Sequence, residues 1–264
     1  MNKIKAIVLK DWAEVFRNRF LLLMTAFLPL VFTAIQLFTL FSMRGMGGSS
    51  NVASSAGLPP QFAQICANLN SGDCLQYFVV MQFMLLYMLV PMILPMTFAA
   101  YSIVGEKKTR TLEPLLATPV TTIELLVGKM LAAALPGVLA TWIGFLIYAI
   151  GARLLVTSDK VYALLIDPLW LTAIFITGPL LSILSVSIAV MVSSRVNEPR
   201  VAEQISGLFV LPITGLLVAQ SAGLIIIDHK LILVFTVIVF VLDCVLVFFA
   251  TRLFQREQIL TRWK

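Results

Sequence analysis

Long stretches without charged residues are the feature that most constrains this 264-residue chain. A helix needs ~20 apolar residues to cross the hydrocarbon core of a membrane, and six charge-poor windows are long enough. Only 12% of the residues are charged, against ~25% in soluble domains, which is too few to cover a water-facing surface. We therefore predict an all-α polytopic membrane protein, with residues 1–264 forming one transmembrane domain. The windows are Arg19–Arg44, Asp73–Glu106, Lys129–Arg153, Asp167–Arg195, Glu203–Asp228 and Leu231–Thr251.

The positions of Lys and Arg predict the orientation of these spans. Six spans place both termini on one side of the membrane. If that side is the cytoplasm, all but four of the 19 basic residues are cytoplasmic, as the positive-inside rule requires. The four others are Arg44, Arg153, Lys160 and Lys230. We expect a plasma (inner) membrane protein with cytoplasmic segments at 1–19, 104–129, 193–203 and 251–264, and an outside loop at 43–76.

The N-terminal segment is predicted to be an amphipathic helix on the inner membrane face. Within residues 3–18, the apolar side chains at positions 4, 7, 8, 12, 15 and 16 follow helical spacing, and Asp11 interrupts this stripe. The alternative is a charged tail that only sets topology. The next apolar stretch begins at Phe20 and exceeds the ~7–15 residues of a signal-peptide core, so we expect it to be retained. The net charge of +6 is attributed to topology and not to nucleic-acid binding.

The outside loop contains two of the three cysteines. Cys66 and Cys74 are close in sequence, whereas Cys244 lies in span six. A compartment outside the inner membrane can be oxidising, so these two can form a disulfide that closes the loop. Two free thiols are the alternative.

The segment between spans two and three carries the most information. It reads GEKKTRTLEPLLATPVTTIELLVGK over residues 105–129. Thr111 can begin a short helix because Pro114 falls in its first turn, and Pro119 ends it. Thr121 and Glu124 then form a capping box that begins the next helix. We expect a short, rigid, charged helix in the cytoplasm; a solvated basic loop is the alternative.

This segment resembles a known family. The pattern GE…T.E.LL.TP.T..ELL.GK is similar to the coupling-helix region of type-2 ABC exporter permeases, which include sodium, drug and polysaccharide exporters. The similarity covers the whole chain in length and span number, and returns at SSRVNEPRVAEQISGLFVLP. It implies a type V exporter fold and a half-transporter that pairs with a second copy or paralogue and binds two ATPase subunits. The implied coupling residues are Glu106, Arg110, Thr111, Glu113, Leu115, Leu116, Pro119, Glu124, Gly128 and Lys129.

Motifs for catalysis are missing from this sequence. Gly128-Lys129 is followed by Met130, and Ile123 stands five positions before Gly128, so the pair is not part of a P-loop. His229 is the only histidine, which rules out HExxH, and GxSxG does not occur. We expect a non-catalytic subunit without a cofactor or metal of its own, and a partner ATPase that binds ATP and Mg²⁺.

Polar residues inside the spans suggest where a substrate passes. Asp243 is the one charged residue within span six, so a secondary transporter that uses Asp243 is the alternative function. Spans one, two and five of two copies are predicted to enclose a narrow, mainly apolar cleft that suits an amphipathic or lipid-like substrate. Its polar residues would be Gln36, Gln82, Thr97, Thr214 and Gln220. A contact between neighbouring helices is the alternative role for each of these residues.

Overall fold

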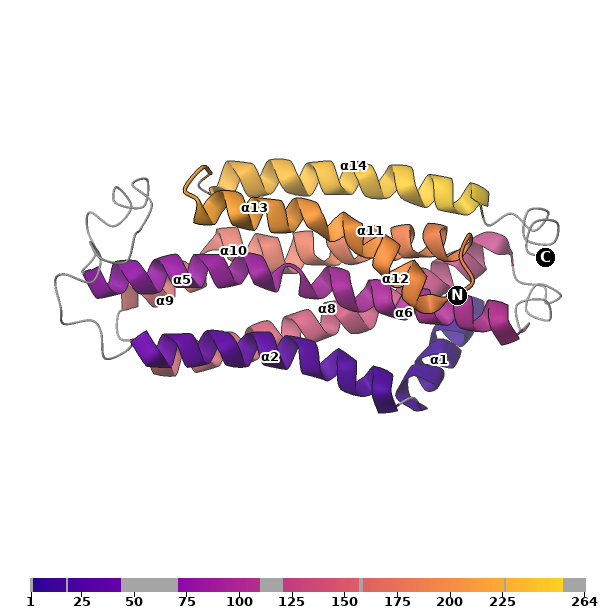
Figure 1. Ribbon diagram of the computed structural model, residues 1–264, viewed down its shortest axis with the longest axis horizontal. Helices are drawn as coiled ribbons and strands as arrows, with labels where there is room; N and C mark the ends of the chain where they lie inside the picture. Colours follow the sequence, from indigo (N-terminus) through magenta and orange to yellow (C-terminus); the bar gives the residue numbers. More distant parts are fainter. Residues whose placement is uncertain are drawn as a thin grey trace.

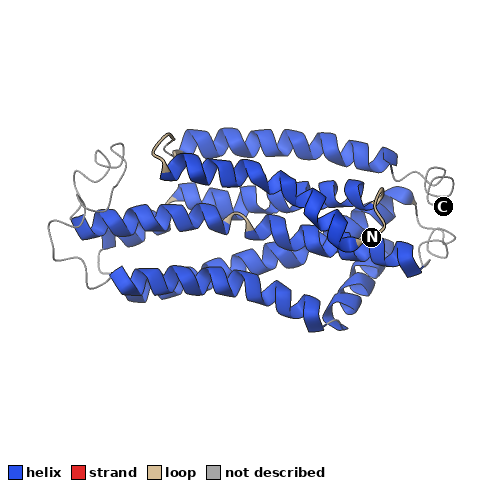
Figure 2. Ribbon diagram, viewed as in Figure 1, coloured by secondary structure: helices blue, strands red, loops and turns tan. Residues whose placement is uncertain are grey.

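The computed structural model describes residues 2–17, 19–43, 71–109, 121–156, 159–225 and 227–253. Every regular element in these ranges is a helix (Figure 2). The helices form an elongated bundle (Figure 1) with six segments long and apolar enough to span a membrane. The predicted all-α polytopic fold with six spans is confirmed. The six segments are Thr25–Met43, Asp73–Lys108, Ile123–Leu155, Val161–Ser193, Pro199–Ser221 and His229–Arg252.

The first three spans are built mostly from long helices. They comprise α2 (Arg19–Met43), the pair α5 (Ser71–Tyr87) and α6 (Val90–Thr109), and α8 (Thr122–Leu155), and they are preceded by α1 (Asn2–Arg17). The last three spans are more broken. The fourth span comprises α9 (Asp159–Leu165), α10 (Pro168–Thr172), the π-helix η2 (Ala173–Thr177) and α11 (Gly178–Ser193). The fifth comprises α12 (Pro199–Gly207), the 3₁₀ helix η3 (Leu208–Val210) and α13 (Leu211–Ser221), and the sixth is α14 (His229–Leu253).

The second and fourth spans form the centre of the bundle. In their most apolar windows 67% and 61% of residues are buried, against 17% in both the fifth and the sixth span. Figure 1 shows α14 along one edge and α2 along the other, with α5 and α6 running between them. Helix α1 crosses one end of the bundle obliquely, and we call this end the α1 end. The predicted N-terminal helix therefore exists, while its place at a membrane surface stays a prediction.

Three prolines inside the bundle each release a backbone carbonyl that another helix then satisfies. A helical proline has no N–H to donate to the carbonyl four residues earlier. Pro95 thus releases the Pro91 carbonyl, and Ser182 Oγ of α11 donates to it at 2.7 Å. Pro136 releases the Ala132 carbonyl, and Trp12 Nε1 of α1 donates to it at 3.0 Å.

The third case involves the π-helix. Gly178 N–H donates to the carbonyl of Ala173, five residues earlier, so in this register Pro179 leaves the Ile174 carbonyl without its donor. Trp142 Nε1 of α8 donates to the Ile174 carbonyl at 3.3 Å. The prolines therefore create specific ties between α6 and α11, α1 and α8, and α8 and the fourth span.

The second span is interrupted between α5 and α6. Pro91 cannot donate to the Tyr87 carbonyl, and the turn at Met88 and Leu89 instead makes short-range bonds to Leu85 and Leu86, each 3.0 Å long. The Tyr87 hydroxyl donates to the Thr141 carbonyl of α8 at 3.1 Å. A Cβ at Gly144 would collide with this hydroxyl, so the glycine allows α8 to approach the interruption.

The tie between α6 and α11 predicts a stability difference between two serines of α11. Ser182→Ala should lower the free energy of unfolding by about 1–3 kcal/mol, because the buried Pro91 carbonyl loses its donor. Ser187 is an equally buried control whose hydroxyl only donates within its own helix, to Ile183, so Ser187→Ala should cost clearly less. Thermal unfolding in detergent measures both variants. Equal losses would contradict the role assigned to Pro95.

Candidate functional site

A buried cluster of charged side chains joins α1, α6 and α8 at the α1 end of the bundle. Lys129 of α8 lies at its centre, with Nζ 2.7 Å from Glu106 Oε2 of α6 and 3.4 Å from Asp11 Oδ2 of α1. All three residues are at most 6% exposed. Removing such charges from water is costly unless they are paired, so three helices must keep their relative positions here.

Two further side chains complete this charged cluster. Lys10 Nζ lies 2.7 Å from Glu106 Oε1 and is partly exposed, so it connects the cluster to the surface. Ser102 Oγ accepts a hydrogen bond from Lys129 Nζ at 3.0 Å and donates to Asp11 Oδ2 at 3.3 Å. Two lysines thus face two carboxylates, and the balance of charge allows their burial.

The start of α8 sets the position of Lys129. Thr121 Oγ1 accepts from the Glu124 N–H at 3.2 Å, and Glu124 Oε2 accepts from the Thr121 N–H at 2.8 Å, so the predicted capping box is formed. Helix α1 packs closely on the next turn of α8. A Cβ at Gly128 would lie 3.0 Å from Ile7 Cγ2, which explains the glycine beside Lys129.

Helix α6 also makes polar contacts with the segment between the fourth and fifth spans. Lys107 Nζ donates to the Val196 carbonyl at 3.3 Å, next to α12. Farther along α6, Thr97 Oγ1 lies 2.6 Å from Glu203 Oε1 of α12. The end of α6 is therefore fixed to α1 and α8 on one side and to α12 on another.

The structure brings together only part of the predicted coupling set. Glu106 and Lys129 pair directly, Gly128 forms the α1 contact, and Glu124 caps α8. The others lie outside the described residues, so the predicted helix from Thr111 to Pro119 stays a prediction. These others are Arg110, Thr111, Glu113, Leu115, Leu116 and Pro119.

Three members of the charged cluster were not predicted as site residues. Lys10, Asp11 and Ser102 come from segments far from Lys129 in sequence. One signal was visible in the sequence, because Asp11 interrupts the apolar stripe of an amphipathic helix. A carboxylate on the buried face of such a helix requires a cation opposite it, and Lys129 supplies that cation.

Three of the five predicted pathway residues, Gln36, Thr97 and Gln220, make separate contacts between helices of one copy. Gln36 donates to the Phe83 carbonyl at 3.1 Å, and Gln220 Nε2 lies 3.5 Å from Met81 Sδ, so both face α5. Thr97 pairs with Glu203, and Thr214 donates to the Leu211 carbonyl of its own helix. Gln82 is half-buried. The structure does not gather these five residues into one cavity within a single copy.

Asp243 lies on α14, in the sixth span. Asp243 is 5% exposed, and among the described residues neither carboxylate oxygen has a hydrogen-bond partner.

Cys74 is buried and disulfide-bonded, while Cys66 lies outside the described residues, so their pairing stays a prediction. Cys244 is a free, exposed thiol.

The chain matches a known family. A family model described as ABC-2 family transporter protein matches residues 5–230. This region extends from α1 to the beginning of α14 and includes every residue of the charged cluster. No curated protein sequence matches the chain.

The charged cluster predicts a large effect from removing its central cation. Lys129→Met leaves the buried carboxylates of Glu106 and Asp11 undercompensated and should cost ~3–5 kcal/mol of unfolding free energy. Adding Glu106→Gln should recover part of this loss. Lys3→Met is the control, because Lys3 is exposed and its ion pair with the partly exposed Glu124 is 3.7 Å long, so its loss should change the unfolding free energy little. If thermal unfolding in detergent shows both lysines to be equally tolerant, the cluster does not hold the three helices together.

Proposed function

The chain belongs to the ABC-2 family of transporter proteins, and from this we propose that it is the membrane-spanning permease subunit of an ATP-driven exporter. Two copies, or one copy and a paralogue, form the translocation path and bind two separate ATPase subunits. The observation that carries this proposal is the charged cluster, which joins three helices directly beside the segment between α6 and α8.

The proposed coupling element is the segment 110–120. It is connected to α6 through Thr109 and to α8 through Thr121. Glu106 and Lys129, which lie within a few turns of these two junctions, form an ion pair. A movement of the segment, driven by a bound ATPase subunit, then passes to α6 and α8 together. Through Asp11 and Lys10 it also reaches α1.

The energy source must be another chain in this proposal. The sequence has no P-loop, because Met130 stands where the motif needs Ser or Thr. ATP and Mg²⁺ are therefore bound by the ATPase subunits, while this chain contributes binding surfaces and helix movement. No catalytic role is assigned to its residues.

The proposed path lies between two copies along spans one, two and five. Span five leaves large apolar side chains exposed, among them Leu208, Phe209, Leu211 and Val218. Gln36 and Gln220 are buried inside one copy, and the amide oxygen of Gln82 is buried too. Of the predicted pathway residues, the partly exposed Thr214 is therefore best placed to meet a substrate. An apolar lining with few polar groups favours an amphipathic or lipid-like substrate, since it cannot replace the hydration of an ion.

The orientation can be tested with two single-cysteine variants on a background that lacks the native cysteines. The distribution of basic residues predicts that both termini, and segment 104–129, lie in the cytoplasm. A membrane-impermeant thiol reagent added to intact cells should label Ser50→Cys and leave Lys108→Cys unlabelled. After permeabilisation both should react, which controls for local accessibility. The reverse pattern in intact cells would overturn the topology.

Coupling can be tested at Glu113, which belongs to the proposed contact with the ATPase. Glu113→Ala should preserve membrane insertion and binding of the ATPase but reduce ATP-driven transport at least several-fold, because a carboxylate that can pair with the ATPase is lost. Reconstituted complexes report transport and ATP hydrolysis side by side. Asp159→Ala is the control, since Asp159 is an exposed acid at the opposite end of the bundle and pairs only with Arg153 in the described structure. Normal transport with normal substrate-stimulated hydrolysis in Glu113→Ala would refute the assignment.

A further inference from the structure

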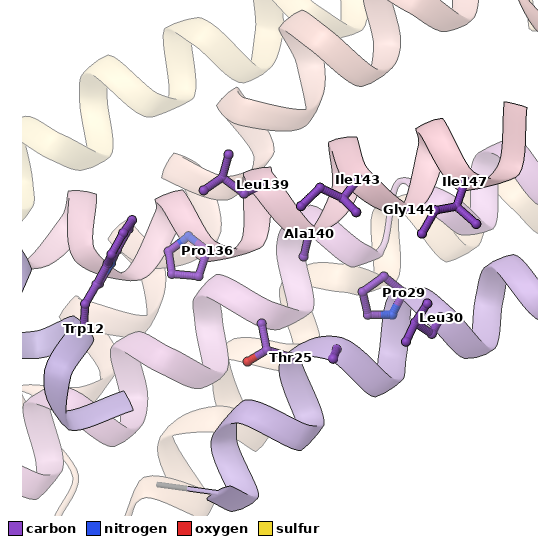
Figure 3. A pocket seen from close by; sticks show the side chains of 11 residues that line it. Trp12, Thr25, Pro29, Leu30, Pro136, Leu139, Ala140, Ile143, Gly144 and Ile147 are labelled. Atoms are coloured by element: carbon purple, nitrogen blue, oxygen red, sulfur yellow. The ribbon is translucent and has the colours of Figure 1, made fainter. Parts of the chain in front are cut away.

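An apolar groove of about 330 Å³ runs between α2 and α8 on the outside of the bundle. Figure 3 shows Trp12 of α1 at one end, Pro29 and Leu30 on α2, and Leu139, Ile143 and Ile147 along α8. Leu30, Leu139, Ile143 and Ile147 are each at least 41% exposed, so they form open rims and not part of the protein core.

The groove follows from the sequence of the two helices. Small side chains at Ala26, Ala140 and Gly144 leave space where larger residues would fill it. Gly144 cannot be larger because its Cβ would collide with the Tyr87 hydroxyl. Pro29 and Pro136 disturb both helices at this level, and the Trp12 indole is held there by the Ala132 carbonyl that Pro136 releases.

Positive charge lies at the α1 end of this groove. Arg19 begins α2 and is exposed, as is Arg17 at the end of α1. Seven residues separate Arg19 from Ala26, which is two helical turns or about 10 Å, so the two share one face of α2. Since Ala26 lines the groove, Arg19 lies along the same line, beyond its α1 end. Guanidinium groups bind phosphate strongly through paired N–H donors.

We propose that this groove binds one acyl chain of an anionic membrane phospholipid, whose phosphate lies against Arg19 and Arg17. The side chains that line the groove are almost all apolar, so a hydrocarbon chain can lie in it without leaving a buried polar group unpaired. One acyl chain alone binds only weakly, and a basic site beside it supplies the second attraction that makes binding stable.

The bound chain would also act on the charged cluster. It packs against Trp12, the neighbour in sequence of Asp11, and so stabilises α1 in its contact with α8. Occupation of this site does not depend on the proposed export function.

Photo-crosslinking of the whole permease tests the site. The protein is reconstituted in nanodiscs of phosphatidylcholine that contain a small fraction of phosphatidylglycerol with a diazirine at the end of one acyl chain. After irradiation, adducts should concentrate on residues 25–30 and 136–147, several-fold above α14. Helix α14 is the internal reference, because it exposes apolar residues such as Leu233, Val237 and Phe240 and takes no part in the groove. A phosphatidylcholine probe with the same diazirine should label the groove several-fold less.

Two exposed alanines of α2 provide matched variants. Ala26→Trp fills the groove and should reduce its labelling to the level of α14, whereas Ala34→Trp lies outside the groove and should leave labelling unchanged. If Ala26→Trp is poorly folded, Ala140→Leu fills the groove from α8. Arg19→Gln should remove the preference for the anionic probe. Labelling that is uniform over α2, α8 and α14, or that persists in both groove-filling variants, would overturn the proposal.

Discussion

The structure depends on the rule that a backbone carbonyl released inside a membrane bundle must find another donor. Lipid cannot supply one, so a proline in a spanning helix is tolerated where a neighbouring side chain, an ordered water or a local change of helix register compensates for the lost bond. Pro95, Pro136 and Pro179 each meet this condition through Ser182, Trp12 and Trp142, respectively. Each of these hydrogen bonds joins two different elements. The proline that removes a hydrogen bond from its own helix therefore creates a bond between that helix and a neighbouring one. This accounts for these three prolines without assigning them a role in transport. Helix α8 takes part in two of the three ties, as acceptor at Ala132 and as donor through Trp142.

Buried charge adds a second set of ties at the α1 end. Helix α1 brings Lys10 and Asp11, α6 brings Glu106, and α8 brings Lys129, and no two of these helices can separate without leaving a charge exposed to an apolar environment. Asp243 is the contrasting case. It is equally buried, but the described residues offer its carboxylate no donor, and it lies on one of the least buried spans. Glu106 and Asp243 both lie within spans, but only Glu106 faces cations on neighbouring helices. Whether a buried acid holds helices together therefore depends on the partner that the facing helix supplies, and not on its position in the span.

Much of the fold could be predicted because it depends on local sequence. Six spans follow from charge-free length, and the start of α8 follows from Thr121 and Glu124. The charged cluster could be predicted only in part. Motif similarity identified Glu106 and Lys129, but their pairing with Lys10, Asp11 and Ser102 depends on how α1 crosses the bundle. That crossing is set by a tertiary contact of Ile7 with Gly128 and by a carbonyl that Pro136 releases, and neither has a local signature.

These ties limit how the proposed exporter can move. A push on segment 110–120 cannot spread α6 from α8, because Glu106 and Lys129 join them close to both junctions. Helix α1 must move with them, because Asp11 and Lys10 belong to the same charged cluster. Helix α12 must move too, because Thr97 and Lys107 of α6 contact Glu203 and Val196 on that side. The helices at the α1 end must therefore move as one body. Helix segments can then move relative to one another only where the backbone is already interrupted. The second span has such an interruption at Met88 and Leu89, well away from the charged cluster. A hinge at this interruption would let α5 change its angle relative to α6. When the ATPase displaces α6 in the proposed mechanism, the angle of α5 would change, and with it the shape of the opposite end of the bundle.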